Sequence, residues 1–246
     1  NMIIGYKTKV NPDKIDVKVV KQEMIDGLID DVEELTAIYS RFPSPEQLFS
    51  YINETQLAYN EDLLNPADNK EKYLDTRTLT LNLGVYIADL AYLTLFETYK
   101  KSIEYFEAVH YISNRIRISS AFDEPIARRI KNNLMNIDSL KAISNDSYFS
   151  IVNYLVENDK EKTLAVISSG AYIECLYIAT QLVEEYKEKD PMITKIAEQK
   201  YSIDNLYQYL NGHREDPSIQ GTIKDIMQIK VLFDKIEEID LGAATM

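Results

Sequence analysis

The 246-residue sequence is poor in residues that interrupt helices or form covalent cross-links. It contains seven glycines, seven prolines, one cysteine and no tryptophan. Chains built from strands need many turns, so a low content of glycine and proline favours long helices joined by short loops. The single cysteine, Cys175, excludes an intrachain disulfide and a zinc site of paired cysteines. We therefore predict an all-α chain that folds without covalent or metal support.

Positive charge is also scarce in this sequence. There are 27 Lys and Arg residues against 40 Asp and Glu residues, which gives a formal net charge of −13. Nucleic acids and anionic membranes both attract basic surfaces, so we expect neither as a partner. The sequence lacks the G-x-G-x-x-G and Walker phosphate-binding segments and the G-x-S-x-G turn of serine hydrolases. It predicts no catalytic residue, no cofactor and no metal ion.

Two long apolar segments, Leu79–Phe96 and Ala165–Leu182, align without gaps. Five identities fall within eleven positions: Gly84, Tyr86, Ile87, Leu90 and Thr94 match Gly170, Tyr172, Ile173, Leu176 and Thr180. Their spacing puts apolar residues on one helical face in each segment. A glycine inside a helix costs roughly 1 kcal/mol relative to alanine. Its presence in both segments predicts a close helix–helix approach and two pseudo-repeated halves.

The first segment is about long enough to cross a lipid bilayer. Asp89 would then lie near the middle of the membrane, at a cost of about 3 kcal/mol. No basic flank sets an orientation for such a span. We therefore interpret both segments as buried helices and expect no membrane span in this chain.

Apolar periodicity and capping residues predict about nine helices in a bundle or a short solenoid-like array. They cover about 20–39, 44–59, 76–99, 102–118, 123–135, 138–158, 161–189, 191–210 and 217–239. Residues 1–19 are interpreted as an extended arm or linker. Residues 20–246 then form one helical domain, with halves at about 20–120 and 123–239 centred on helices 76–99 and 161–189.

Asp89 and Glu174 place carboxyl groups inside otherwise apolar helices, where an unpaired charge is costly. They occupy nearly equivalent positions in the repeat, one residue out of register. Two interpretations stay open: hydrogen bonds that hold the helices together, and a polar cleft between the halves that binds a small ligand. The candidate ligand-binding residues are Tyr86, Asp89, His110, Tyr172 and Glu174.

Histidine is limited to His110 and His213. Glu107 and His110 form a Glu-x-x-His motif, which occurs twice in the helical proteins that hold two metal ions with carboxylates. Residue 210 is a leucine, so a second such motif is missing and a dinuclear site is excluded. A mononuclear site formed by Glu104, Glu107 and His110 stays open as an alternative.

The segments GVYIADLAY (84–92) and GAYIECLY (170–177) together resemble a pattern in uncharacterised all-helical exported proteins of Bacteroidetes bacteria, often classed as lipoproteins. That pattern is roughly G-x-Y-x-x-D-L-x-Y followed by G-x-x-x-E-x-L-Y. The resemblance implies a helical protein of the periplasm or cell envelope with no established activity. It also implies that a lipid anchor, if there is one, is attached to a residue upstream of this chain. A cytoplasmic location stays open.

The sequence therefore favours a non-enzymatic envelope protein that binds an unknown protein or small molecule in the groove between its two halves. The alternative is a helical enzyme that acts on a small molecule or uses a metal, centred on Asp89, Glu174 and His110. The two hypotheses differ in whether the two carboxyl groups and the imidazole meet in one cleft.

Overall fold

The computed structural model describes residues 44, 45, 49, 52, 58–121, 148–183, 185 and 190–236. The chain divides into two compact units, Asn1–Ser40 and Arg41–Met246, and every described residue belongs to the second. All regular structure in the described ranges is helical, which confirms the predicted all-α class. The predicted arm at 1–19 and the predicted helices at 20–39 and 123–135 lie outside the described residues.

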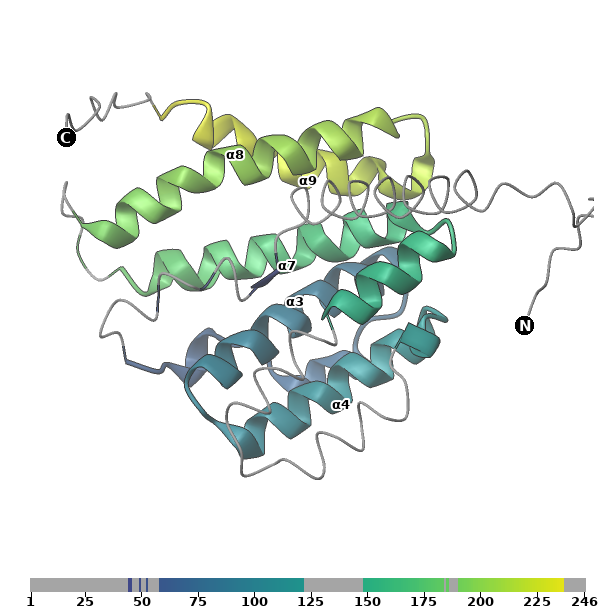
Figure 1. Ribbon diagram of the computed structural model, residues 1–246, viewed down its shortest axis with the longest axis horizontal. Coiled ribbons are helices and arrows are strands. Elements are labelled where there is room, and N and C mark those ends of the chain that lie inside the picture. The colour runs from purple at the N-terminus through teal and green to yellow at the C-terminus, as the bar shows by residue number, and fades with distance from the viewer. Residues whose placement is uncertain are drawn as a thin grey trace, which may run out of the picture. The chain divides into compact units, whose positions relative to one another are not determined.

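Five α-helices have both ends within the described ranges (Figure 1). They are α3 (Thr76–Leu95), α4 (Tyr99–Arg115), α7 (Glu161–Gln181), α8 (Pro191–Gly212) and α9 (Pro217–Phe233). Residues 148–157 are helical as well. Three short 3-10 helices complete the set: η3 (Glu61–Leu63), η4 (Ala67–Glu71) and η5 (Ser119–Ala121). Each of the α-helices corresponds to a helix predicted from the sequence.

Aspartate residues cap the N-termini of three of these helices. Asp75, Asp190 and Asp216 each accept a hydrogen bond from a backbone N–H in the following turn, at 2.8 to 2.9 Å. A carboxylate at this position satisfies a free amide and interacts favourably with the helix dipole. Pro191 and Pro217 occupy the first turn of α8 and α9, where a missing N–H costs nothing.

The two central helices are shorter than the sequence predicted. α3 ends at Leu95, because Glu97 adopts a positive φ of 63° and turns the chain. Tyr99 begins α4 instead of ending α3. α7 ends at Gln181, so the predicted range of 161–189 is wrong at its C-terminal end. No glycine or proline marks either end, so the apolar pattern alone gave no signal that the helix had stopped.

The glycine of each central helix lies against the backbone of the other. A Cβ atom on Gly84 would lie 2.6 Å from the amide N of Ala171 and closer still to the carbonyl O of Ile167. A Cβ atom on Gly170 would lie 2.8 Å from the carbonyl C of Leu81 and would clash with its O. Each glycine thus meets the residue three positions before the other glycine. This reciprocal contact confirms the predicted close approach.

α3 and α7 run in the same direction. Gly84 lies beside Ile167 and Ala171, and five residues further along α3 Asp89 interacts with Glu174. Residue numbers therefore increase in the same direction along both helices. This pair makes the most extensive contact between any two described elements. α4 packs against α3, and α8 and α9 pack against α7 (Figure 1).

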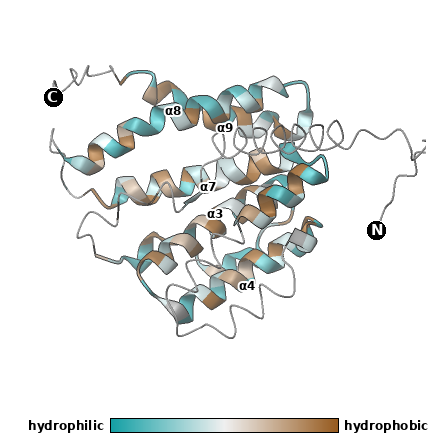
Figure 2. Ribbon diagram, viewed as in Figure 1, coloured by the Kyte–Doolittle hydropathy of each residue, from teal (hydrophilic) through white to brown (hydrophobic). Residues whose placement is uncertain are grey.

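α3 and α7 are long and apolar enough to cross a membrane when only length and composition are considered. In the structure, however, 67% and 72% of their apolar windows are buried inside the protein itself. Figure 2 shows more hydrophilic residues along α8 than along α3. The two central helices therefore pack as core helices, as predicted.

α9 connects to the N-terminal ends of both central helices. Arg77 of α3 forms an ion pair with Asp225, and Lys162 of α7 forms one with Asp216 at 2.8 Å. Gly221 of α9 lies directly against the Arg77 side chain. These contacts hold the starts of α3 and α7 against α9.

Candidate functional site

Asp89 of α3 and Glu174 of α7 lie together between the two central helices. Asp89 is 0% exposed, and Glu174 is partly exposed. Asp89 Oδ2 accepts a hydrogen bond from the backbone N–H of Asn65 at 3.3 Å. In the described part of the chain no lysine, arginine or histidine forms an ion pair with either carboxyl group. As far as the described residues go, the site is therefore a pair of acids without a cation.

The two carboxyl groups hold protons more tightly than usual. Burial raises the pKa of Asp89 well above its ordinary value, and the neighbouring Glu174 carboxyl raises it further. Burial raises the pKa of Glu174 to about 7, although a hydrogen bond from Asp89 acts in the opposite direction. Asp89 is the more buried of the two groups, and its Oδ1 has no hydrogen-bond partner among the described residues.

Four tyrosines surround Asp89. Burial raises the pKa of Tyr59, Tyr86, Tyr92 and Tyr105, in the case of Tyr59 to about 12. The negative charge that Asp89 can carry adds to this effect for all of them except Tyr92. Tyr86 packs edge-on against Tyr105 at 5.9 Å, and Tyr59 stacks on Tyr92 at 5.8 Å. These phenols stay protonated near neutral pH, so they pack and donate hydrogen bonds but do not act as bases.

The segment before α3 closes over Asp89 through Asn65. In addition to its backbone bond to Asp89, the Asn65 side chain donates to Tyr73 Oη at 2.9 Å. It also accepts a hydrogen bond from Asn69 Nδ2 at 2.8 Å. A network in which each member has a partner orders a loop firmly. The loop therefore helps to shield Asp89, which is fully buried, from solvent.

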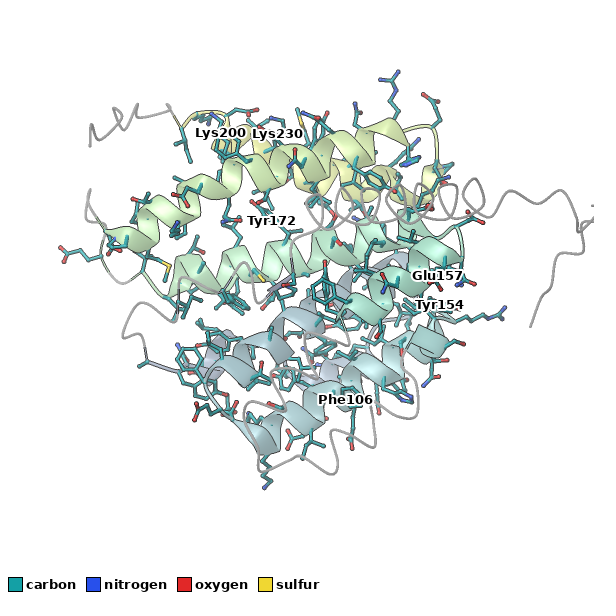
Figure 3. All side chains as sticks on the ribbon, viewed as in Figure 1. Phe106, Tyr154, Glu157, Tyr172, Lys200 and Lys230 are labelled. Atoms are coloured by element: carbon teal, nitrogen blue, oxygen red, sulfur yellow. The ribbon has the colours of Figure 1, made fainter. Side chains whose placement is uncertain are left out.

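Tyr86 and Tyr172 use their hydroxyl groups to hold neighbouring segments. Tyr86 Oη donates to the carbonyl of Pro66 at 2.9 Å, beside Asp89. Tyr172 Oη donates to the carbonyl of Gln199 in α8 at 3.0 Å, and Figure 3 shows this side chain between α7 and α8. The structure therefore brings Tyr86 to the acid pair but directs Tyr172 towards α8.

His110 does not join the two carboxyl groups. It is exposed on α4, and its Nδ1 lies 3.2 Å from Asn114 Nδ2. The sequence interpretation included His110 among the candidate ligand-binding residues. Successive residues of a helix point about 100° apart, and the buried face follows Val109. The predicted meeting of His110 with Asp89 and Glu174 is therefore absent from the described structure.

No group of three or more His, Cys, Asp and Glu side chains in the described ranges could hold a metal ion. Glu104, Glu107 and His110 are all exposed on α4 and do not form the mononuclear site that the sequence left open. Cys175, next to Glu174, is buried as predicted, and burial raises the pKa of its thiol.

Three neighbours of Asp89 were not identified from the sequence: Tyr59, Asn65 and Tyr105. Tyr105 could have been found, because it continues the helical spacing of Val109 and Ile112 towards the N-terminus of α4. Asn65 lies in the irregular segment before α3, where no periodicity indicates which side chains turn inward. Tyr59 falls at the end of the predicted helix 44–59, but residues 58–60 are not helical in the structure.

No protein-family model, no curated protein and no solved structure matches this chain. The resemblance to exported proteins of Bacteroidetes therefore rests on residues 84–92 and 170–177 alone.

Proposed function

We propose that this chain is a non-enzymatic binding module of the cell envelope, with about nine helices in two related halves around α3 and α7. The two-half organisation is supported by the repeat in the sequence and by the reciprocal contact of Gly84 and Gly170. The envelope location is inferred from the family resemblance only. A signal peptide or a lipid-modified cysteine encoded upstream of Asn1 would test that location directly.

The observation that carries the binding proposal is the unneutralised acid pair. One half supplies Asp89 and the other supplies Glu174, and the described residues provide no cation for either. Glu174 reaches the surface, and Tyr177, one turn further along α7, is 43% exposed. A carboxylate beside an aromatic ring is a suitable site for a protonated amine. The amine can form an ion pair with the carboxylate and lie over the face of the ring. The ligand, or the partner side chain, is therefore a primary amine.

Catalysis fits this geometry less well. A general acid or base must come within hydrogen-bond distance of its substrate. Asp89 is fully buried beneath its loop, and the hydroxyl of Tyr86 is bonded to a backbone carbonyl. Glu174 alone is accessible, and the histidine required by the enzymatic alternative lies exposed on α4.

The test uses cadaverine as the probe and 1,5-pentanediol as its neutral analogue of similar length. At about pH 8 the Glu174 carboxyl is ionised, and an amine at about 100 times its Kd stabilises the folded protein by about 2.7 kcal/mol. Cadaverine should raise the melting temperature of the wild type, and pentanediol should not. Glu174→Gln should remove the effect, whereas Glu107→Gln, which changes an exposed glutamate on α4, should retain it. An equal cadaverine effect in both variants, or none in the wild type, would reject the proposed site.

A further inference from the structure

The acid pair lies directly beyond the point where the two central helices touch. Gly84 and Gly170 hold the backbones of α3 and α7 in contact, and Asp89 and Glu174 face one another one to two turns further on. The helices are parallel, so both carboxyl groups are on the same side of the glycine contact. The glycine contact and the acid pair are therefore two successive contacts along the same helix–helix interface.

The described groups that face the pair offer no positive charge to balance it. They come from each element packed around it: Tyr86 and Tyr92 of α3, Tyr59 and the Asn65 N–H of the preceding segment, Tyr105 of α4, and Cys175 of α7. Each of these is a neutral donor or a weak acid. A second negative charge, on the fully buried Asp89, would consequently have no cation among the described residues to stabilise it.

We propose that Asp89 and Glu174 form a pH-sensitive latch between α3 and α7, closed while the pair holds a proton and open once both groups are ionised. With a proton present, one carboxyl group donates to the other and joins the two helices. With both protons lost, two like charges face one another in a buried contact, and their repulsion and hydration move the helices apart. This inference does not depend on amine binding.

The direction of the pH dependence follows from the raised pKa values. The unfolded chain releases both protons near pH 4, whereas the folded protein retains them to higher pH. The stabilisation is therefore fully present at acid pH and is lost as pH rises through the folded-state pKa values. The pKa of Glu174 is about 7 and burial raises that of Asp89 well above its ordinary value, so the latch opens as the pH rises past neutrality.

Cys175 provides a local probe of this opening. It is the only cysteine in the chain, it is adjacent to Glu174, and it is 2% exposed. The rate of its reaction with 4,4′-dithiodipyridine can be measured in native protein and in urea-unfolded protein at the same pH. The ratio of the two rates is a protection factor. Because both rates are measured at the same pH, the ionisation of the exposed thiol affects them equally and cancels in the ratio. This protection factor should fall about tenfold or more between about pH 6 and pH 9 in the wild type.

In Glu174→Gln, which cannot acquire the second charge, the fall should be less than about threefold, and Glu107→Gln should behave like the wild type. Asp89→Asn should flatten the profile in the same way as Glu174→Gln, provided that it folds. A wild-type protection factor that does not change with pH, or an equal fall in Glu174→Gln, would overturn the latch. If cadaverine fails to bind while this profile is obtained, the proposed function is rejected and the latch stands.

Discussion

The α3–α7 pair and the α8–α9 pair are both helix–helix contacts within one chain, and they are held together in different ways. In the first pair the backbones touch at Gly84 and Gly170. In the second pair side chains mediate the contact: Lys230 of α9 lies 2.5 Å from Asp204 of α8, and Lys200 Nζ donates to the carbonyl of Ile236 (Figure 3). Side chains can adjust when a neighbour changes, whereas a backbone cannot. The two pairs should therefore differ greatly in their tolerance of substitution.

The largest expected effect comes from adding a single methyl group at the α3–α7 contact. In Gly84→Ala and in Gly170→Ala the new Cβ would lie well within van der Waals contact of the facing backbone. The helices must then move apart and lose packing along their length. We expect each substitution to reduce the free energy of unfolding by about 3 kcal/mol, or to prevent folding. Urea unfolding followed by circular dichroism measures this.

Gly212→Ala is the matched control for these two substitutions. Gly212 is the last residue of α8, no atom lies within 4 Å of a Cβ placed there, and its φ is not positive. Alanine has the higher helix propensity, so this variant should be unchanged or up to about 1 kcal/mol more stable. Losses of equal size at Gly84, Gly170 and Gly212 would show that the backbone contact does not matter.

Gly221→Ala should have an intermediate effect, because it replaces a glycine that faces a side chain. A Cβ atom there would lie 2.6 Å from Arg77 Nε. The guanidinium can move aside, but it then loses its ion pair with Asp225, in which both side chains are more than a third exposed. We expect a loss of about 1 kcal/mol in urea unfolding.

A double-mutant cycle separates the steric clash with Arg77 from the other effects of Gly221→Ala. In an Arg77→Met background the flexible thioether can make room, and no ion pair remains to be lost. Gly221→Ala should then be neutral or slightly stabilising. A loss that persists in the Arg77→Met background would mean that α9 is as rigidly packed as the α3–α7 contact.

The sequence indicated the α3–α7 contact because a glycine in a helix is unfavourable unless something requires it. Two glycines at matching positions of the two aligned segments therefore carried information about packing that apolar periodicity alone does not contain. The same alignment placed Asp89 and Glu174 at nearly equivalent positions, but it did not give the relative direction of the two helices. The ends of α3 and α7 could not be predicted. After α3, for example, Glu97 turns the chain with a positive φ although it is not a glycine.

Other parts of the candidate site depended on features that a single sequence does not specify. Tyr172 and Tyr86 are equivalent in the repeat, but α7 has α8 on the side where α3 has the loop containing Pro66. Their hydroxyl groups therefore bond to unrelated segments. His110 was a candidate ligand-binding residue, but it follows the apolar Val109, and the sequence pattern does not decide which of these two adjacent residues is buried.

The smallest expected effect is that of Lys230→Met, in the pair held by side chains. Lys230 Nζ lies 2.5 Å from Asp204 and 2.7 Å from Asp234, and its hydrogen bonds to these carboxylates raise its pKa. Its side chain is 18% exposed, and the two aspartates are more exposed. Methionine retains most of the apolar stem, and both carboxylates can turn to water. We therefore expect a loss of no more than about 1 kcal/mol.

Salt should distinguish this loss from the one at the glycine contact. At about 1 M NaCl the Debye length falls to about 3 Å, so the difference between wild type and Lys230→Met should shrink to within error. The effect of Gly84→Ala should persist, because steric overlap is not screened by ions. Urea unfolding of both variants at low and high salt makes the comparison. If the Lys230→Met loss were large and unaffected by salt, the α8–α9 pair would depend on a fixed geometry in the same way as α3–α7. The contrast between backbone and side-chain contacts would then not explain how this chain tolerates substitution.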